Sequence, residues 1–381
     1  MSLILQGERL REARRFRQLS ITELAENVGV SKQMISKYER NESIPSIEVY
    51  QKIISNLEFP LKFFQQKDKF ELIDKGTFYR SRLTSTQSEK KPSEMLKKYL
   101  TVLCDLFDQY VEFPTLEQYE FSKNPQDAAL QLRNYWELGN SPIQNMMLLL
   151  EKHGFRISSV SSTSEKVDAF GSFNEINGNR YYCILIDKDN NSFYRQQYSL
   201  AHELGHWVLH SNTIDPFELS TQEYRRMEEE ADIFASNFLM PESSFLIDIN
   251  KAKNSLEGFI SLKEKWNVSI ASMLYRARSL NVLSAEDYIK LQKRMSYKRF
   301  NKVEPFDSIK EVPRPLALKQ TFNLLIEAKI FDRDNLQTLL ENHYGLSLPD
   351  DILADLIGVE LKDLINSDKK IVELKKFKEE E

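Results

Sequence analysis

The sequence predicts a multidomain protein in which an all-helical head precedes an α+β body and a helical C-terminal region. Three observations lead to this prediction. Residues 5–65 contain short stretches with apolar residues at helical spacing, separated by capping and turn residues. Residues 155–195 change to runs of β-branched and aromatic residues, which favour a small antiparallel sheet. Helical spacing then returns from residue 196 and continues to about residue 365.

Length and composition restrict the class of protein. At roughly 150 residues per domain, 381 residues suggest two or three domains. The net charge of -5 excludes a wholly basic nucleic-acid coat but allows one local DNA-binding module. Two cysteines exclude a disulfide scaffold and a Cys-rich zinc module. Because the chain shows neither an apolar run of about 20 residues nor a secretory signal, we expect it to be cytoplasmic.

The head has the local signals of consecutive short helices. Residues 7–17 form the first predicted helix. Ser20 and Glu23 have the spacing of a capping box, which opens a second helix. Gly29 suits a tight turn that needs a positive φ, and Ser31 then caps a third helix. A helix, a short turn with glycine and another helix form the helix-turn-helix layout.

In this layout the second helix of the pair enters the major groove of double-stranded DNA. Its exposed residues are predicted to be Lys32, Gln33, Ser36 and Lys37. Lysine suits guanine or phosphate, and glutamine suits adenine. The alternative is a helical bundle that only docks other proteins. Residues 1–60 hold 9 Lys and Arg against 8 Asp and Glu, so we expect modest non-specific affinity for DNA.

The stretch LSITELAENVGVSKQMISKYERNESIPS resembles the XRE family, which has the Cro/C1-type repressor helix-turn-helix. The resemblance extends over about 60 residues at the N-terminus. It implies that the head binds DNA.

A second motif indicates metal chemistry. His202, Glu203 and His206 form the pattern HExxH, within the apolar stretch YSLAHELGHWVL. Residues i and i+4 share one face of a helix, so both imidazoles can bind one ion. Glu203 is then placed to act as general base for a water bound to that ion. Burial of two histidines and a glutamate on an apolar helix is costly unless a metal satisfies them.

A catalytic zinc takes three protein ligands and keeps one open position. His210 lies eight residues after His202, about 12 Å along a helix, so one straight helix cannot bring it to the same ion. We therefore expect His210 to be a packing or surface histidine.

The next predicted helix, YRRMEEEADIFASNFLMP, supplies a better third ligand. Glu228 and Asp232 share its apolar face, whereas Glu229 and Glu230 are expected to face solvent. Glu228 is the predicted third ligand. Asp232 is predicted to accept the second N–H of one ligand histidine, His202 or His206.

HExxH followed by Glu228-Glu-Glu-Ala-Asp232 is similar to the gluzincin arrangement within the zincin-like peptidases. More narrowly, residues 125–315 resemble the ImmA/IrrE family of metallopeptidases. The matching pieces are LRNYWELGNSPI, LLLEKHGFRI, DAFGSF, QYSLAHELGHWVLH, EEEADIFASNFLMP and WNVSIASMLYRARSLNVLS. The resemblance implies a zinc-dependent endopeptidase that cleaves an XRE-type repressor of a mobile element or stress-response locus. Some members carry an N-terminal XRE domain.

Three functions remain open at this point. One is the repressor-cleaving peptidase. Another is a transcription regulator whose peptidase-like domain senses a ligand or metal without cleaving. The third is a component of a toxin–antitoxin or phage-defence system. The expected domains are an XRE-type head at 1–65, a linker at 66–92, a zincin-like α+β peptidase domain at 93–300 and a helical region of unknown role at 301–381. Double-stranded DNA, a protein substrate and a second copy of the chain are the expected partners.

Overall fold

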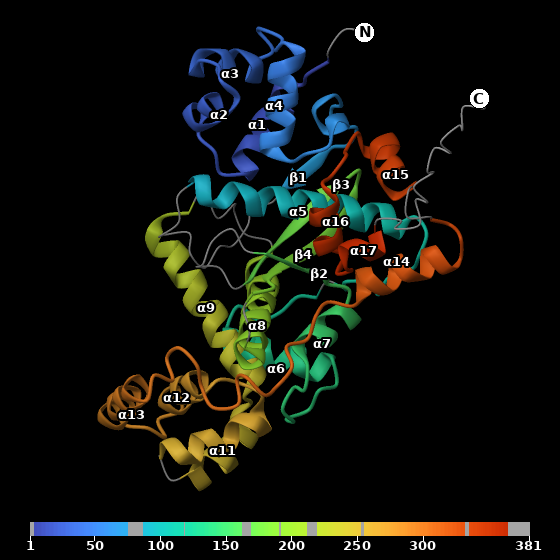
Figure 1. Ribbon diagram of the computed structural model, residues 1–381. Coiled ribbons are helices and arrows are strands. Elements are labelled where there is room, and N and C mark those ends of the chain that lie inside the picture. Colours follow the sequence, from blue (N-terminus) through green and yellow to red (C-terminus); the bar gives the residue numbers. More distant parts are fainter. Residues whose placement is uncertain are drawn as a thin grey trace, which may run out of the picture.

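The computed structural model describes residues 4–74, 87–117, 119–161, 169–189, 192–211, 219–252, 255–331 and 335–364. A four-stranded sheet lies near the centre, with helices on both faces (Figure 1). The helical head occupies one end of the molecule, and α11–α13 occupy the other. The expected fold class, a helical head followed by an α+β body and a helical C-terminal region, is confirmed. Among the described helices, none is both long and apolar enough to cross a membrane.

The head follows the predicted local signals closely. Ser20 and Glu23 form the capping box, with both reciprocal hydrogen bonds present. Gly29 ends the second helix with φ at 78°, in the left-handed region where glycine is favoured. Ser31 accepts a hydrogen bond from the backbone N–H of Met34 and so caps the third helix. The helices of the head are α1 (Gly7–Phe16), α2 (Ile21–Val28), α3 (Lys32–Glu39), α4 (Ile47–Leu57) and the 3-10 helix η1 (Leu61–Phe64).

The sheet has the strand order β1-β3-β4-β2. β3 pairs antiparallel with β1 and with β4, whereas β2 pairs parallel with β4. The expectation of an antiparallel sheet is therefore wrong for β2. The β3–β4 hairpin turns at Asn177 and Gly178, both with positive φ as a two-residue hairpin requires. Composition predicts strands but not their order, which depends on pairing between distant segments. The strands are β1 (Leu72–Asp74), β2 (Arg156–Val160), β3 (Ala169–Ile176) and β4 (Asn179–Asp187).

The two faces of the sheet are buried against different helices. On one face, Cys183 and Leu185 of β4 belong to a core that includes α5. On the other face, Tyr182 and Ile184 belong to a core that includes α8. The helices of the body are α5 (Gln87–Asp108), α6 (Pro125–Tyr135), α7 (Met146–Lys152), α8 (Phe193–His210), α9 (Thr221–Leu239), α10 (Glu242–Ile249), the 3-10 helix η3 (Asn250–Ala252), α11 (Leu256–Trp266), α12 (Ile270–Ser279) and α13 (Ala285–Tyr297).

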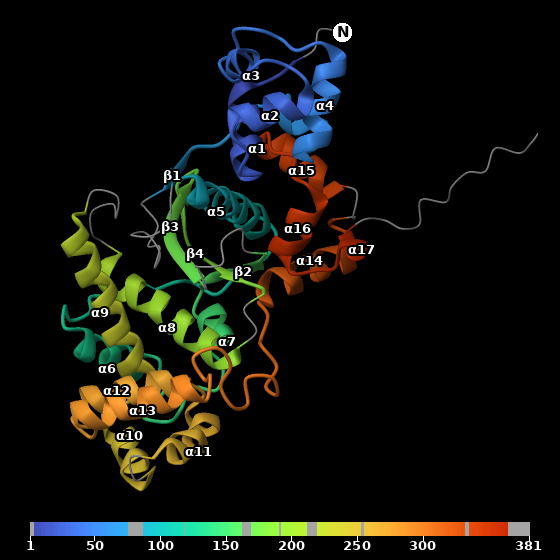
Figure 2. The same cartoon turned by 60° about the vertical axis from the view of Figure 1, so that its left-hand side comes forward.

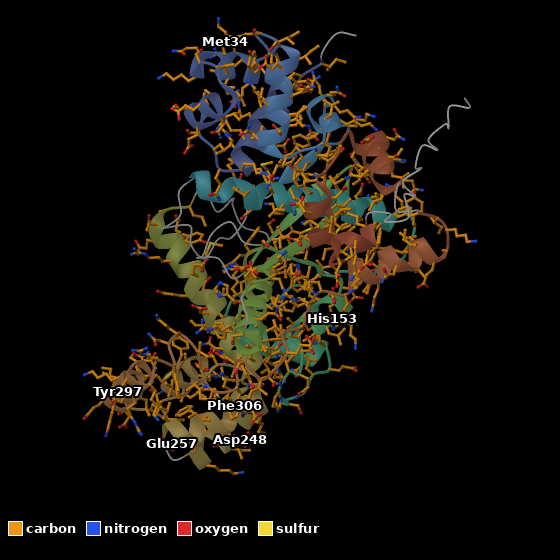
Figure 3. The ribbon with its side chains drawn as sticks, in the orientation of Figure 1. Met34, His153, Asp248, Glu257, Tyr297 and Phe306 are labelled. Carbon is orange, nitrogen blue, oxygen red and sulfur yellow. The ribbon has the colours of Figure 1, made fainter. Side chains whose placement is uncertain are left out.

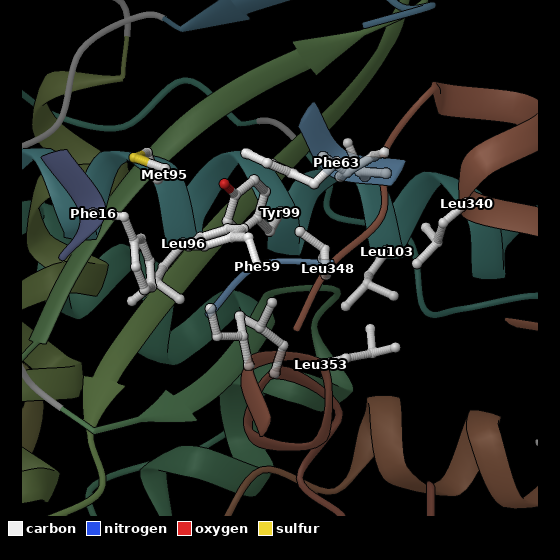
Figure 4. Close-up of a cluster of buried hydrophobic side chains, with 14 of the residues drawn as sticks. Phe16, Phe59, Phe63, Met95, Leu96, Tyr99, Leu103, Leu340, Leu348 and Leu353 are labelled. Atoms are coloured by element: carbon white, nitrogen blue, oxygen red, sulfur yellow. The ribbon is translucent and has the colours of Figure 1, made fainter. Parts of the chain in front are cut away.

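The core on the α5 face is continuous with the core of the head (Figure 4). Phe16 of α1 packs against Tyr99 of α5, and Leu340 and Leu353 of the C-terminal region join the same cluster. Packing thus crosses the boundaries expected at residues 65 and 301, although those domain limits stay predictions. The C-terminal helices are α14 (Ala317–Glu327), α15 (Asn335–Tyr344), α16 (Asp350–Ile357) and α17 (Leu361–Leu364).

Ion pairs and a hydrogen bond also connect the head to the body. The guanidinium of Arg9 in α1 is buried and contacts Asp68 at 2.5 Å. Lys98 of α5 contacts Asp68 at 2.8 Å and Glu12 of α1 at 2.9 Å. Arg9 also donates to the backbone carbonyl of Gly345 at 3.0 Å. The head therefore sits in a defined orientation on α5 and on the loop after α15.

Candidate metal centre

The HExxH residues lie in the interior of α8, the 18-residue helix that crosses one face of the sheet. Ser192 caps its first turn by accepting a hydrogen bond from the backbone N–H of Arg195. His202, Glu203 and His206 are all at most 2% exposed. The expectation that this motif lies on a buried helix is correct, and its polar groups must find partners inside the protein.

Helix α9 packs against α8 (Figure 2), and its Glu228 contacts both histidines. The Nε2 atoms of His202 and His206 lie 3.1 Å apart. One Glu228 oxygen lies 3.4 Å from Nε2 of His202, and the other lies 3.4 Å from Nε2 of His206. The three predicted ligands thus converge at one point.

These distances fit a tetrahedral zinc site. With metal–ligand bonds of about 2.0–2.1 Å, tetrahedral angles separate neighbouring ligand atoms by roughly 3.3 Å. Two imidazole nitrogens and a carboxylate are also donors that zinc favours. In the described part of the chain, His202, His206 and Glu228 are the group of side chains that could hold a metal ion, with ligand atoms all within 4.8 Å of one another. The residues present therefore fit the metal that the sequence predicts.

The surroundings make the two imidazoles electrostatically different. Burial disfavours the charged form of His202, but hydrogen bonds and negative charges from Asp232 and Glu228 outweigh it and raise its pKa to about 9. For His206, burial prevails over its contact with Glu228 and lowers its pKa to about 3. Burial also opposes the charge of Glu228, yet its hydrogen bonds with the two histidines hold the pKa of this carboxyl well below its ordinary value.

The outer nitrogens of both imidazoles have partners. Nδ1 of His202 lies 2.9 Å from Oδ1 of Asp232, so Asp232 contacts His202 rather than His206. Nδ1 of His206 lies 3.0 Å from Nδ1 of His210. The other ring nitrogen of His210, Nε2, lies 3.1 Å from Oε2 of Glu230. The expectation that Glu230 faces solvent is wrong, because its carboxylate turns toward α8. Glu229 is exposed, as expected.

Sequence reasoning missed two residues that lie against Glu203. A Cβ added to Gly171 of β3 would be 3.1 Å from the Glu203 carboxylate and 2.9 Å from the ring of Tyr182. The Tyr182 hydroxyl donates to the backbone carbonyl of Glu203 at 3.3 Å. A glycine within an apolar strand pattern is the signal that could have found this close approach. Tyr181 lies on the opposite face of β4, where it contacts Asp105 of α5.

The predicted DNA-reading residues belong to α3, which lies at the end of the head far from the sheet (Figures 1 and 2). Lys32, Gln33 and Lys37 are exposed, and Ser36 is half-buried. Met34 of the same helix also lies at this outer end (Figure 3). The described parts of the body leave this face of the head accessible.

The fold and the site define a class of protein, a helix-turn-helix head joined to an α+β body with a buried HExxH helix. Comparison with known families agrees with both parts. Residues 10–64 match the family described as Helix-turn-helix, and residues 150–278 match the family described as IrrE N-terminal-like domain. The chain therefore carries an XRE-type helix-turn-helix domain followed by an IrrE-like domain.

A protein of Methanococcus vannielii, named as an HTH-type transcriptional regulatory protein, is 32% identical over 155 residues. The match covers 39% of this chain and 46% of that protein, so this chain spans about half of its relative. The crystal structure of Bacillus thuringiensis PlcR with the peptide PapR7 and DNA aligns with 80% of this chain and 99% of that one. The sequence identity of this alignment is 13%, and its TM-score is 0.15.

We predict that Gly205→Ala destabilises the protein. An added Cβ would lie 3.1 Å from the backbone oxygen of Ala231 and from the ring of Phe234, both on α9. Alanine is favoured over glycine in a helix by about 1 kcal/mol, but overpacking a core costs about 1–3 kcal/mol. Urea denaturation should show a free energy of unfolding lower by about 1 kcal/mol. A variant more stable than the wild type would mean that α9 shifts by the few tenths of an ångström that the added methyl group needs.

Proposed function

We propose that this protein is a zinc-dependent endopeptidase with a DNA-binding head, and that its substrate is an XRE-type transcriptional repressor. The observation that carries the proposal is the convergence of His202, His206 and Glu228, with Glu203 next to the first ligand on the same buried helix. The IrrE-like domain supports the peptidase class, because it includes all four residues.

In this proposal each residue has a distinct task. His202, His206 and Glu228 hold the metal, and Asp232 orients His202. A bound zinc ion would polarise the scissile carbonyl and lower the pKa of a water to about 7. Glu203 accepts the proton of the attacking water and passes it to the leaving amine. Gly171 and Tyr182 pack against Glu203 and hold it in place.

The helix-turn-helix head supports DNA as a partner and gives a reason for the choice of substrate. XRE domains often pair with each other, so a repressor of the same type offers a surface that the head can recognise. The head then directs the peptidase to its substrate, either on the operator or by direct contact with the repressor. Release of the repressor from DNA would derepress the locus.

A specific observation favours a second function, that of a regulator which senses a ligand or metal without cleaving. The head, α5 and the C-terminal helices share one core, so a change in the body has a direct route to the DNA-binding face. The two functions differ in one respect. The peptidase needs the carboxylate of Glu203, whereas a sensor that only binds the metal does not.

We expect about one zinc ion per chain, and we expect Glu228→Ala to weaken its binding. The loss should exceed the roughly 10–100-fold that follows loss of an outer partner, because Glu228 supplies a ligand atom itself. Competition with a chelating dye measures the affinity, and elemental analysis measures the stoichiometry. Glu229→Ala is the matched control, because its side chain is exposed on the same helix. An equal loss in both variants would contradict the assignment of Glu228.

The experiment that tests catalysis uses Glu203→Gln. The variant should keep the fold and the zinc, because it removes no ligand, yet cleave roughly 10²–10⁴-fold more slowly without its general base. The substrates are XRE-type repressors encoded near this gene, and mass spectrometry detects their fragments. Cleavage at the wild-type rate would exclude Glu203 as the base. If the zinc-loaded wild type cleaves none of these repressors, the sensor function is favoured.

We expect Gln33→Ala to reduce sequence preference more than total DNA affinity. Gln33 is exposed near the start of α3, where side chains reach base edges. Loss of one bidentate base contact costs about 1–3 kcal/mol of discrimination. Binding to duplexes enriched from a random pool, compared with unselected duplexes, measures this preference. Gln51→Ala, at an exposed position on α4, is the control. Equal discrimination by Gln33→Ala and the wild type would remove Gln33 from the contact set.

A further inference from the structure

The two histidines of the candidate metal centre have different partners at Nδ1, the ring nitrogen that faces away from the proposed ion. Nδ1 of His202 contacts the carboxylate of Asp232 at 2.9 Å, which is the common partner of a metal-binding histidine. Nδ1 of His206 instead contacts another imidazole, that of His210, at 3.0 Å. His210 is 4% exposed, so this contact lies inside the protein.

The contact continues from His210 toward the surface of α9. Nε2 of His210 lies 3.1 Å from Oε2 of Glu230. The other oxygen of Glu230 accepts a hydrogen bond from Arg226 at 2.9 Å, and the side chain of Arg226 is 80% exposed. His206, His210, Glu230 and Arg226 thus form one hydrogen-bonded chain, which we call the His210 relay.

The chemistry of the end groups fixes the direction of every bond in the His210 relay. An ionised carboxylate can only accept, so Nε2 of His210 must carry a hydrogen and donate it to Glu230. In a neutral imidazole the other nitrogen then holds the lone pair, so Nδ1 of His210 accepts from Nδ1–H of His206. This leaves the lone pair of His206 on Nε2, which faces His202 and Glu228 as a ligand atom must.

We propose that His210 and Glu230 are positioning residues that fix the tautomer and ring orientation of His206 for the metal. The proposal rests on the metal site of the proposed function and adds residues that the HExxH motif does not contain. Helical spacing explains the arrangement, because His210 follows His206 by one turn. His210 lies too far along α8 to bind the same ion as His202, but it is close enough to contact Nδ1 of His206.

The test compares two substitutions at position 210 in the full-length protein. His210→Leu keeps an apolar side chain of moderate size but removes the acceptor. His210→Asn restores an acceptor, because its Oδ1 occupies roughly the place of Nδ1. We expect His210→Leu to raise the zinc dissociation constant by about 10–100-fold, and we expect His210→Asn to recover most of this loss. Competition of Zn²⁺ with a chelating dye measures both constants.

A spectroscopic readout separates positioning from simple packing. Co²⁺ bound in place of zinc absorbs visible light with a spectrum that depends on ligand geometry. His210→Leu should change this spectrum, and His210→Asn should resemble the wild type. Glu230→Ala should raise the dissociation constant in the same direction, and its half-buried side chain makes it the safer variant for folding. Glu229→Ala, exposed on the same helix, should match the wild type.

Wild-type zinc affinity and an unchanged cobalt spectrum in His210→Leu would overturn the proposal and leave the metal site intact. If His210→Leu does not fold, wild-type zinc affinity in Glu230→Ala overturns it equally. A loss shared by the Leu and Asn variants, together with lower thermal stability of both metal-free proteins, would assign His210 to packing alone. Failure of the wild type to bind zinc would contradict the proposed function itself.

Discussion

The close approach of α8 and α9 is the constraint on which the candidate site depends. The ligand atoms come from two helices, and Glu228 reaches the histidines of α8 only if the helices nearly touch. Gly205, between the two histidines in sequence, favours this approach, because a Cβ there would lie 3.1 Å from the backbone oxygen of Ala231, closer than ordinary van der Waals contact. The same stretch of α8 thus carries two of the candidate ligands and a glycine that leaves room for the helix bearing the third.

The same contact organises the second layer of the site. Asp232 of α9 contacts Nδ1 of His202, and Glu230 of the same helix contacts Nε2 of His210. His202 is therefore contacted directly from α9, whereas His206 is contacted by His210 of its own helix, which α9 contacts in turn. The packing of these two helices therefore sets both the positions of the candidate ligands and the hydrogen-bond partners of their outer nitrogens.

Most of what the sequence predicted correctly depends on neighbours along the chain. The capping box of Ser20, the turn at Gly29 and the shared face of His202 and His206 all follow from local geometry. What it missed depends on contacts between distant segments. The parallel pairing of β2 and the approach of Gly171 to Glu203 are examples. Helical phase put Glu228 on the face of α9 that meets α8, where the structure also has it, but it could not show that the long side chain of Glu230 bends toward a ring on α8.

The core that joins the head to α5 and the C-terminal helices has a geometric consequence. Because the head packs rigidly against the body, the position of α3 also sets the position of the candidate site. Two copies bound to half-sites one helical turn apart would have their heads separated by about 34–36 Å. The distance between the two IrrE-like domains would then also depend on the half-site spacing. In such a pair, the half-site spacing in the DNA would set the distance between the two candidate sites.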